Sequence, residues 1–362
     1  MKLAFRNMTM VPRVLYGTGA FDQLTSILEP KRLNARAPFI FLVDDVFTQY
    51  HEFVQRIPVG YEDEIIFVST LEEPTTNQVD ELVQQIILKY KEMPSGIVGI
   101  GGGSVMDLTK AVSLLLTNHG NASDYQGWDL IQNSGIFSVG IPTISGTGAE
   151  VSRTAVLKGP DIKLGINSDF TTFDQVVLDP DLTADVSKNQ WFFTGMDCFI
   201  HCVESLNGTF LNAFSQAHGE KAMALCQNVF LKSALSELEK REQLMMASWL
   251  GGVSIANSQV GVAHALSYGL SFVKGIKHGL GNCIVIEHLD AYYPEGTQLF
   301  RKMRDYQQID IPKGICENLS EDEYRQMTRI ALGLSPLWEN ALGKNWQSLV
   351  NEKVVRGLYE KM

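Results

Sequence analysis

Apolar residues in the first half of the chain occur in short unbroken runs that are separated by amphipathic stretches. The runs at 38–43, 64–68 and 96–100 have the length and continuity of strands that are buried on both faces of a sheet. Between the last two runs, apolar residues recur every three or four positions over 79–87, which is the spacing of one helical face. Strands that alternate with helices predict an N-terminal α/β domain with a Rossmann-like parallel sheet.

In the second half of the chain, the apolar residues are spaced differently. Apolar positions recur there at helical spacing over long stretches, at 191–206, 214–235, 242–256, 264–270, 321–334 and 346–359. Strand-like runs almost disappear after Asp179-Pro180. Because 362 residues exceed the size of one compact core, we expect two domains, an α/β domain over 1–183 and an all-α domain over 184–362.

Composition and charge narrow the function classes. Hydrophobic residues make up 45% of the chain and charged residues 20%, as in an ordinary soluble globular protein. Acidic residues outnumber basic ones by 41 to 30, and no long basic run is present, so we do not expect a nucleic-acid partner. No apolar run approaches the roughly 20 residues of a membrane span, so we expect no membrane partner either.

The cysteines and the first residues of the sequence indicate the cellular compartment in which we expect the protein. The five cysteines lack CxxC spacing and form an odd set, which suits reduced thiols better than a disulfide framework. Charged and amide residues, followed by Pro12, interrupt the first residues before an apolar signal-peptide core can form. We therefore expect a cytoplasmic protein.

Two loops of small residues follow predicted strands. Gly-Gly-Gly-Ser at 101–104 leads from the third strand into a helix that begins near Asp107, and a loop at 142–150 follows the strand at 137–141. Glycines in this position let the backbone approach a ligand and point N–H groups at an anion such as phosphate. The first loop does not match GxGxxG, and a tight turn explains it as well. Two such loops in one α/β domain favour a dinucleotide.

Asp44 ends the first buried strand, upstream of the glycine loop. A carboxylate there could accept hydrogen bonds from an adenosine ribose, which would favour NAD over a cofactor with a 2′-phosphate. A helix N-cap explains the same residue equally well. Both interpretations stay open at the level of the sequence.

A carboxylate and three imidazoles form the candidate metal site of the helical half. Asp197 and His201 stand four residues apart in a predicted helix, which places both side chains on one face. His264 and His278 follow in stretches of small or apolar residues. The first pair alone could be structural, but the set of four suits a catalytic Zn²⁺ or Fe²⁺ site with room for a substrate oxygen. Such an ion would activate an alcohol whose hydride a nicotinamide accepts.

These motifs, in this order, resemble the iron-containing alcohol dehydrogenase family over nearly the whole chain. The family joins an α/β nucleotide-binding domain to an all-helical metal domain, and it implies a homodimer. The resemblance implies that Fe²⁺ or Zn²⁺ is bound by Asp197, His201, His264 and His278. It also implies that NAD(P) is bordered by Asp44, Gly102, Gly103, Ser104, Asp107, Thr143, Thr147 and Lys163.

The chain departs from the family at one position near the metal. The family usually continues His-Ala-x-Ala-His, whereas this chain has Tyr268 in place of the second histidine. A tyrosine hydroxyl can relay a proton, but its ordinary pKa of about 10 makes it a poorer base at neutral pH. We expect Tyr268 and Lys163 to be the catalytic residues, with Lys163 positioning the nicotinamide or the substrate.

Within the family, the chain most resembles the branch that oxidises the C8 primary alcohol of the sugar acid 3-deoxy-D-manno-octulosonate (Kdo) to an aldehyde. A partner transaminase then converts the aldehyde into an 8-amino sugar for lipopolysaccharide. Dioxygen has been described as the electron acceptor in that branch, whereas the glycine loops favour bound NAD(P). An NAD(P)-dependent dehydrogenase or aldehyde reductase of short alcohols or polyols shares every motif, and a non-catalytic sensor could keep the same fold.

Overall fold

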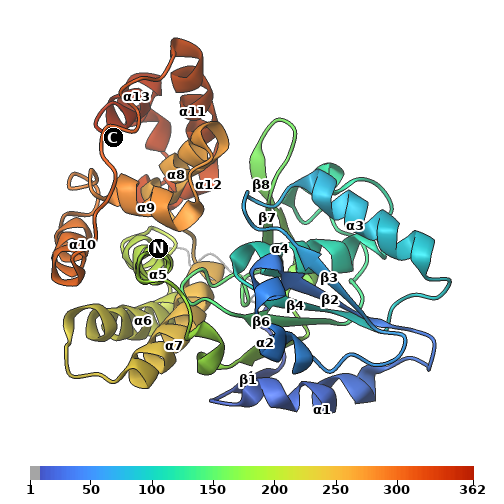
Figure 1. Ribbon diagram of the computed structural model, residues 1–362. Helices are drawn as coiled ribbons and strands as arrows, with labels where there is room; N and C mark the ends of the chain where they lie inside the picture. Colours follow the sequence, from blue (N-terminus) through green and yellow to red (C-terminus); the bar gives the residue numbers. More distant parts are fainter. Residues whose placement is uncertain (1–8) are drawn as a thin grey trace. The chain divides into compact units, whose positions relative to one another are not determined.

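The computed structural model describes residues 9–362, so the expectation of no signal peptide falls on residues outside the described part (Figure 1). Contacts divide the chain into two compact units. The sheet unit consists of residues 9–144 and 149–185, and the helical unit contains 145–148 and 186–362. Among the described residues, none of the helices combines the length and apolar character of a membrane span.

The sheet unit alternates strands and helices as the apolar runs predict. Its strands are β1 Val14–Tyr16, β2 Phe39–Asp44, β3 Glu64–Val68, β4 Gly96–Gly101, β5 Gly127–Trp128, β6 Ser138–Pro142, β7 Thr154–Lys158, β8 Lys163–Asn167 and β9 Gln175–Leu178. Its α-helices are α1 Leu24–Leu28, α2 His51–Gln55, α3 Thr76–Lys89 and α4 Gly103–Leu115.

Six of these strands form one parallel sheet in the order β1-β9-β6-β4-β2-β3. After β2 the chain moves to the edge strand β3, and after β4 it moves to β6 on the opposite side. The neighbouring strands β2 and β4 therefore flank a topological switch point, where open α/β sheets bind ligands at the carboxyl ends of the strands. Asp44 and the glycine loop end these two strands.

Different elements pack on the two faces of the main sheet. Phe39, Phe41 and Val43 of β2 pack with Phe21 and Leu24 in one fully buried cluster. On the other face Gly99 lies against α4, where an added Cβ would meet the Thr109 Oγ1 at 2.2 Å. A glycine in mid-strand thus lets α4 approach the sheet closely. This packing fixes the N-terminus of α4 directly after the glycine loop.

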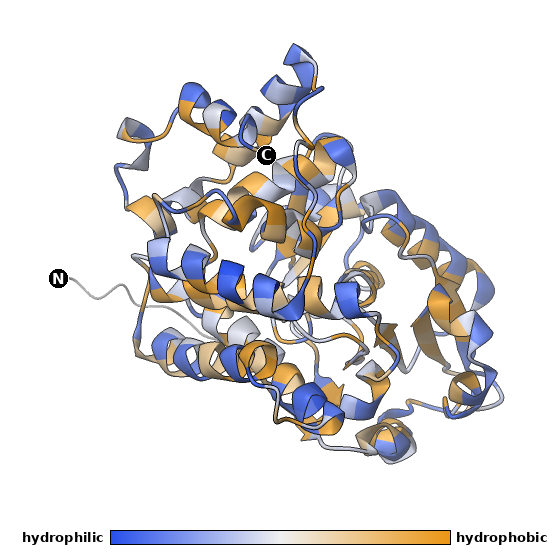
Figure 2. Cartoon of the chain, turned by 60° about the vertical axis from the view of Figure 1, so that its left-hand side comes forward, coloured by the Kyte–Doolittle hydropathy of each residue, from blue (hydrophilic) through white to orange (hydrophobic). Residues whose placement is uncertain are grey.

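The helical unit contains the long helices that the second half predicts. They are α5 Lys188–Leu206, α6 Ala213–Leu231, α7 Glu237–Ala256, α8 Val262–Lys274, α9 His278–Ile286, α10 Pro294–Gln307, α11 Glu321–Gly333, α12 Ser335–Leu342 and α13 Glu352–Tyr359. Helices α5, α6 and α7 pack on one another, and α8 packs against α9, α11 and α12. In Figure 2 many helices carry apolar residues along one side and polar residues along the other.

Three features were not predicted. A small sheet of β5, β8 and β7 lies in the sheet unit, and its shortest strand has two residues, too few for a periodicity signal. Helices α9, α10 and α12 form where no helix was expected. The stretch 346–359 is not one helix but a 3₁₀ turn, Trp346–Ser348, followed by α13, because the Asn351 side chain caps a new helix on the N–H of Val354.

The short loop 145–148 belongs to the helical unit, although the sequence places it between two strands of the sheet unit. An added Cβ on Gly146 would lie 1.8 Å from the carbonyl oxygen of Thr194 in α5. The N–H of Gly148 donates to the Ser248 hydroxyl of α7 at 3.4 Å. Close backbone approach therefore explains why this loop consists of small residues.

Substituting Gly146 by alanine should destabilise the protein more than the same change at Gly17. Both glycines have φ near +143°, at 144° and 142°, so both alanines incur the same backbone strain. Nothing lies within 4 Å of an added Cβ at Gly17, whereas Gly146 has no space for it. We expect about 1–3 kcal/mol of additional destabilisation for Gly146→Ala, measured as the shift in Tm by calorimetry. Equal shifts for the two variants would contradict the close approach to Thr194.

Candidate functional site

The structure brings together the four side chains of the candidate metal site, all within the helical unit. Asp197 and His201 lie one turn apart in α5, His264 lies in the first turn of α8, and His278 begins α9. The Asp197 Oδ1 lies 3.7 Å from the Nε2 of His201, 3.5 Å from that of His264 and 3.6 Å from that of His278. One candidate ligand atom from each residue lies within 4.8 Å of the others.

These separations fit a divalent ion better than they fit direct hydrogen bonds. The 3.5–3.7 Å between the carboxylate oxygen and the ring nitrogens exceeds the 2.7–3.2 Å of ordinary hydrogen bonds. Ligands at about 2.1 Å from a tetrahedrally coordinated ion lie about 3.4 Å from one another. Mixed imidazole and carboxylate donors suit Zn²⁺ or Fe²⁺. The residues present therefore fit the ion that the sequence predicts.

Burial and neighbouring charges set the protonation of the site. Burial lowers the pKa of His201 to about 4, so its ring is neutral near pH 7. Burial also disfavours a charge on His264, but the carboxylates of Glu204 and Asp197 together outweigh it and raise the pKa of His264 to about 9. Burial disfavours the ionised form of Asp197, yet the interactions with His201, His278 and His264 bring its pKa well below its usual value. The carboxylate is consequently ionised.

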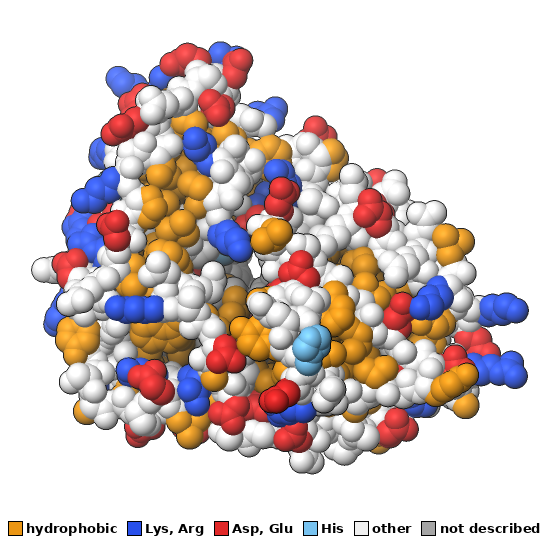
Figure 3. All heavy atoms as spheres, in the orientation of Figure 1, with side chains coloured by type: hydrophobic (Ala, Val, Ile, Leu, Met, Phe, Trp, Pro, Cys, Tyr) orange, Lys and Arg blue, Asp and Glu red, His pale blue; other side chains and the backbone are white. Residues whose placement is uncertain are grey.

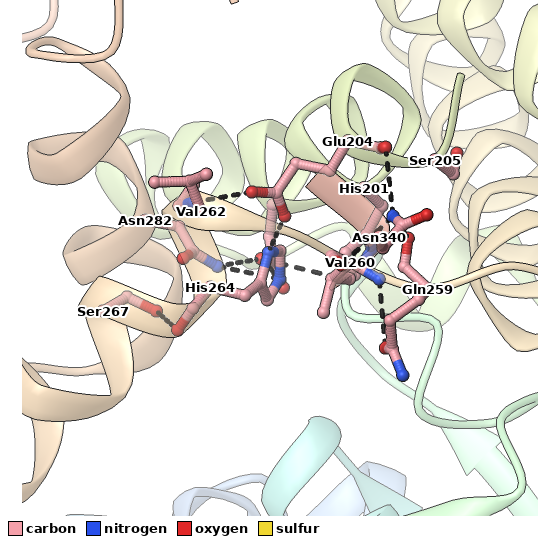
Figure 4. Close-up of polar contacts among 12 residues, drawn as sticks. His201, Glu204, Ser205, Gln259, Val260, Val262, His264, Ser267, Asn282 and Asn340 are labelled. Carbon is pink, nitrogen blue, oxygen red and sulfur yellow. Dashed lines mark hydrogen bonds and ion pairs between the residues drawn. The ribbon is translucent and has the colours of Figure 1, made fainter. Parts of the chain in front are cut away.

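Two buried residues that the sequence reasoning missed hold this cluster in place (Figure 4). Glu204 Oε2 accepts a hydrogen bond from the Nδ1 of His264 at 2.5 Å. The Nδ2 of Asn282 donates to the Asp197 Oδ1 at 2.6 Å and lies 3.1 Å from the Nε2 of His264. Helical spacing could have placed each on the same helix face as a candidate ligand, because Glu204 follows His201 by three residues and Asn282 follows His278 by four, but not have given their partners.

Tyr268 lies beside the cluster. It stands one turn after His264 in α8, and its ring meets that of His278 edge-on, with 5.7 Å between the ring centroids. The side chain is neither fully buried nor fully exposed. The structure thus places the ring of Tyr268 in contact with one of the four candidate metal ligands.

Three candidate nucleotide residues, Asp44, Gly102 and Gly103, lie together at the carboxyl edge of the main sheet. Val43 and Ile100 are neighbours in register, so the strand end at Asp44 lies next to the glycine loop. Asp44 accepts hydrogen bonds from the N–H of Val46 and from the Thr70 hydroxyl at 3.1 Å each, so it caps a 3₁₀ helix. The capping interpretation is thus realised, at a place where a ribose could also be bound.

Packing accounts for part of the glycine loop. An added Cβ on Gly101 would lie 2.5 Å from the Val105 side chain, and one on Gly102 would lie 2.8 Å from Ile144. Gly103 and Ser104 form the first turn of α4, whose N–H groups have no partner further along the helix. The N–H of Thr143 donates to the Gly101 carbonyl at 2.9 Å, which joins the second loop to the first. This edge has the backbone groups that a phosphate requires.

The remaining candidates lie deeper or elsewhere. Lys163 is 2% exposed and its ammonium group pairs with Glu73 at 2.5 Å. Burial raises the pKa of Asp107 to about 7, against the charge of Lys110, which lies 3.9 Å away. Thr147 belongs to the loop that packs in the helical unit, apart from the other nucleotide candidates in the contact division. The sequence did not reveal that the buried Lys163 has a partly buried acidic partner.

Two family models match well over half of the chain. The model described as iron-containing alcohol dehydrogenase matches residues 12–180, and the model of the C-terminal part of that family matches residues 192–335. The chain belongs to the iron-containing alcohol dehydrogenase family. It is therefore an oxidoreductase of the alcohol dehydrogenase type, as the motifs indicated.

Known members of the iron-containing alcohol dehydrogenase family differ in their substrates. A sulfoacetaldehyde reductase of Bilophila wadsworthia is 35% identical over 286 residues, which cover 77% of this chain and 72% of that protein. An NAD-dependent methanol dehydrogenase of Bacillus methanolicus is 28% identical over 295 residues, which cover 79% of this chain and 75% of that protein. Both likenesses extend over most of each chain.

Solved structures share the fold. A sulfoacetaldehyde reductase from Bifidobacterium kashiwanohense, crystallised with NAD+, matches with a TM-score of 0.82 at 19% identity and covers 98% of both chains. A 1,3-propanediol oxidoreductase matches with a TM-score of 0.81 at 20% identity, covering 98% of this chain and 99% of its own. The predicted fold class, a parallel-sheet α/β domain followed by a helical domain, is confirmed.

Replacing either His264 or His278 by alanine should remove one of the four candidate ligands. We expect each variant to bind Co²⁺ or Zn²⁺ more than about 100-fold more weakly than the wild type, beyond the 10- to 100-fold effect of losing an outer partner. Equilibrium dialysis with metal analysis measures this. His119→Ala is the matched control, since His119 is exposed in the sheet unit. Full metal occupancy and activity in both ligand variants would exclude the site.

Proposed function

We propose that this protein is a metal-dependent, NAD(P)-linked oxidoreductase whose metal is bound by Asp197, His201, His264 and His278. The observation that supports it most strongly is the convergence of these four ligand atoms within 4.8 Å in the helical unit. Fe²⁺ and Zn²⁺ both suit this donor set, and cellular supply often decides between them. We further propose that the protein is a cytoplasmic homodimer.

The proposed chemistry divides the work among the residues of the site. A bound divalent ion supplies a Lewis acid that polarises the substrate oxygen and lowers its pKa. Asp197 and the three histidines would hold that ion, and the Tyr268 hydroxyl would relay the proton of the alcohol by accepting it while passing its own proton toward solvent. A nicotinamide cofactor held by the proposed cofactor residues would supply the hydride acceptor. The ring of Tyr268 lies edge-on to that of His278, which places Tyr268 beside the proposed metal ligands.

For the cofactor we propose NAD(P), with NAD favoured by Asp44. Asp44, Gly102, Gly103, Ser104, Asp107, Thr143, Thr147 and Lys163 are the proposed cofactor residues. A carboxylate at the end of β2 repels a 2′-phosphate and accepts hydrogen bonds from a ribose. Two similar proteins, a methanol dehydrogenase named as NAD-dependent and a sulfoacetaldehyde reductase crystallised with NAD+, support the same choice.

For the substrate we propose the C8 primary alcohol of Kdo, oxidised to the aldehyde as a first step toward 8-amino-Kdo for lipopolysaccharide. A transaminase would be the functional partner that consumes the aldehyde. The support is the resemblance to the Kdo-oxidising branch, together with Tyr268 where the family usually has a histidine. Dioxygen remains the alternative electron acceptor.

A second candidate is an NAD(P)-dependent dehydrogenase or aldehyde reductase of short alcohols or polyols. The 35% identity to a sulfoacetaldehyde reductase favours it, since that likeness extends over 77% of this chain. Both candidates use the same proposed metal site and the same glycine loops. They differ in the substrate, and only the Kdo-oxidising candidate has dioxygen as an alternative electron acceptor.

Assaying the purified protein with Kdo, with and without NAD(P)+ and with and without oxygen, tests substrate and acceptor together. We expect turnover of Kdo that requires either NAD+ or oxygen, followed as NADH absorbance or oxygen uptake. Butanol, 1,3-propanediol and glycerol, and sulfoacetaldehyde with NADH, form the comparison panel. Turnover of a panel compound without any response to Kdo would favour the second candidate.

Substituting Tyr268 by phenylalanine tests the proton acceptor. Loss of a general base typically lowers turnover by about 10²- to 10⁴-fold, so we expect kcat of Tyr268→Phe to fall in that range. Tyr268→His should retain turnover and extend it to lower pH, because an imidazole has an ordinary pKa of about 6.5 against about 10 for a phenol. Unchanged kcat in the phenylalanine variant at equal metal content would remove Tyr268 from the mechanism.

A further inference from the structure

Glu204 is a fully buried carboxylate on the same helix as two candidate metal ligands. It lies in α5 with 0% of its surface exposed, seven residues after Asp197 and three after His201. These intervals place all three side chains on one helical face. A buried carboxylate is unfavourable unless hydrogen-bond donors surround it, so its presence here needs a specific reason.

Each oxygen of Glu204 accepts a hydrogen bond from the first turn of α8 (Figure 4). Oε1 accepts from the N–H of Ala263 at 2.6 Å, and Oε2 accepts from the Nδ1 of His264 at 2.5 Å. Because Nδ1–H is held by Glu204, Nε2 is the ring nitrogen of His264 that can lose its proton and bind a metal ion. That Nε2 lies 3.5 Å from the Asp197 Oδ1, within the cluster of candidate ligand atoms.

The segment that leads into α8 packs closely against Glu204. An added Cβ on Gly261 would lie 2.4 Å from the Tyr293 hydroxyl and 3.2 Å from Glu204 Oε1. The Tyr293 hydroxyl accepts from the N–H of Val262 at 3.2 Å, next to the residue that binds Oε1. The Nδ2 of Asn340 donates to the Gln259 carbonyl at 2.8 Å, which fixes the chain leading into α8. The start of α8 is thus held against α5 on several sides.

We propose that Glu204 is a positioning residue, which orients the ring of His264 and presents its Nε2 to the metal. This inference rests on the proposed metal site and adds a residue to it. The two donors are the N–H of Ala263 and the Nδ1–H of His264, so the side chain at 204 must have two oxygens that both accept hydrogen bonds. A glutamine keeps the size of the side chain but turns an NH₂ group toward one of them. The carboxylate cannot be replaced by its amide without loss.

The test compares Co²⁺ binding by the full-length wild type and Glu204→Gln. We expect the Kd for Co²⁺ to rise about 10- to 100-fold in the variant, the range for loss of an outer partner of a ligating histidine, with a changed visible spectrum of bound Co²⁺. Glu204→Asp, which keeps both acceptors on a shorter side chain, should retain more of the affinity than Glu204→Gln. Competition with a chromogenic chelator gives the Kd.

Ser205→Ala is the matched control. Ser205 is the next residue of α5 and is equally buried. Its hydroxyl makes a hydrogen bond to the Ser254 hydroxyl at 2.9 Å, which the alanine variant loses, and it makes none to a candidate ligand. It should lower Tm and leave Co²⁺ affinity within about threefold of the wild type. Wild-type Co²⁺ affinity and spectrum in Glu204→Gln would overturn the role of Glu204.

Gly261→Ala is a second variant, which keeps the carboxylate and crowds it, in case Glu204→Gln does not fold. Its Cβ would push against Glu204 and Tyr293, so we expect weaker Co²⁺ binding in the same direction. Unchanged Co²⁺ affinity in Gly261→Ala would count against the proposal. A wild-type protein that binds no Co²⁺ would contradict the metal site itself, which separates that failure from a failure of Glu204.

Discussion

The helical unit depends on one buried carboxylate that meets three imidazoles. Asp197 can keep its charge in the interior only if donors or a cation surround it, and its partners come from α5, α8 and α9. These helices must therefore approach closely. Glycines permit it, since an added Cβ on Gly279 would lie 2.9 Å from the Phe193 carbonyl of α5. The position of the charge and the packing of the helices determine each other.

The sheet unit obeys a different constraint, set by its topology. The chain leaves β2 toward one side of the sheet and leaves β4 toward the other. The carboxyl ends of these two strands are therefore left open, and the N–H groups at the start of α4 lie there. Neither the carboxylate of Asp44 nor the glycines depend on a ligand for their packing or their hydrogen bonds. A nucleotide at this edge would use groups that the fold has already placed.

Family membership fixes the type of reaction more firmly than the substrate. The face in Figure 3 carries acidic and basic side chains interspersed with apolar ones, as on most soluble enzymes. Relatives named for sulfoacetaldehyde and methanol share most of the chain with this protein. Because one fold supports several reactions of alcohols and aldehydes, the fold alone does not determine the substrate.

The sequence by itself determined the two-part fold and the four candidate ligands, because apolar periodicity and the i, i+4 pair of Asp197 and His201 are local signals. It could not identify Glu204 and Asn282 as partners of His264 and Asp197, since these hydrogen bonds join residues 60 and 85 positions apart. It also could not assign the loop 145–148 to the helical unit or pair Lys163 with Glu73. Contacts between distant parts of a chain follow from packing, which only the tertiary structure decided.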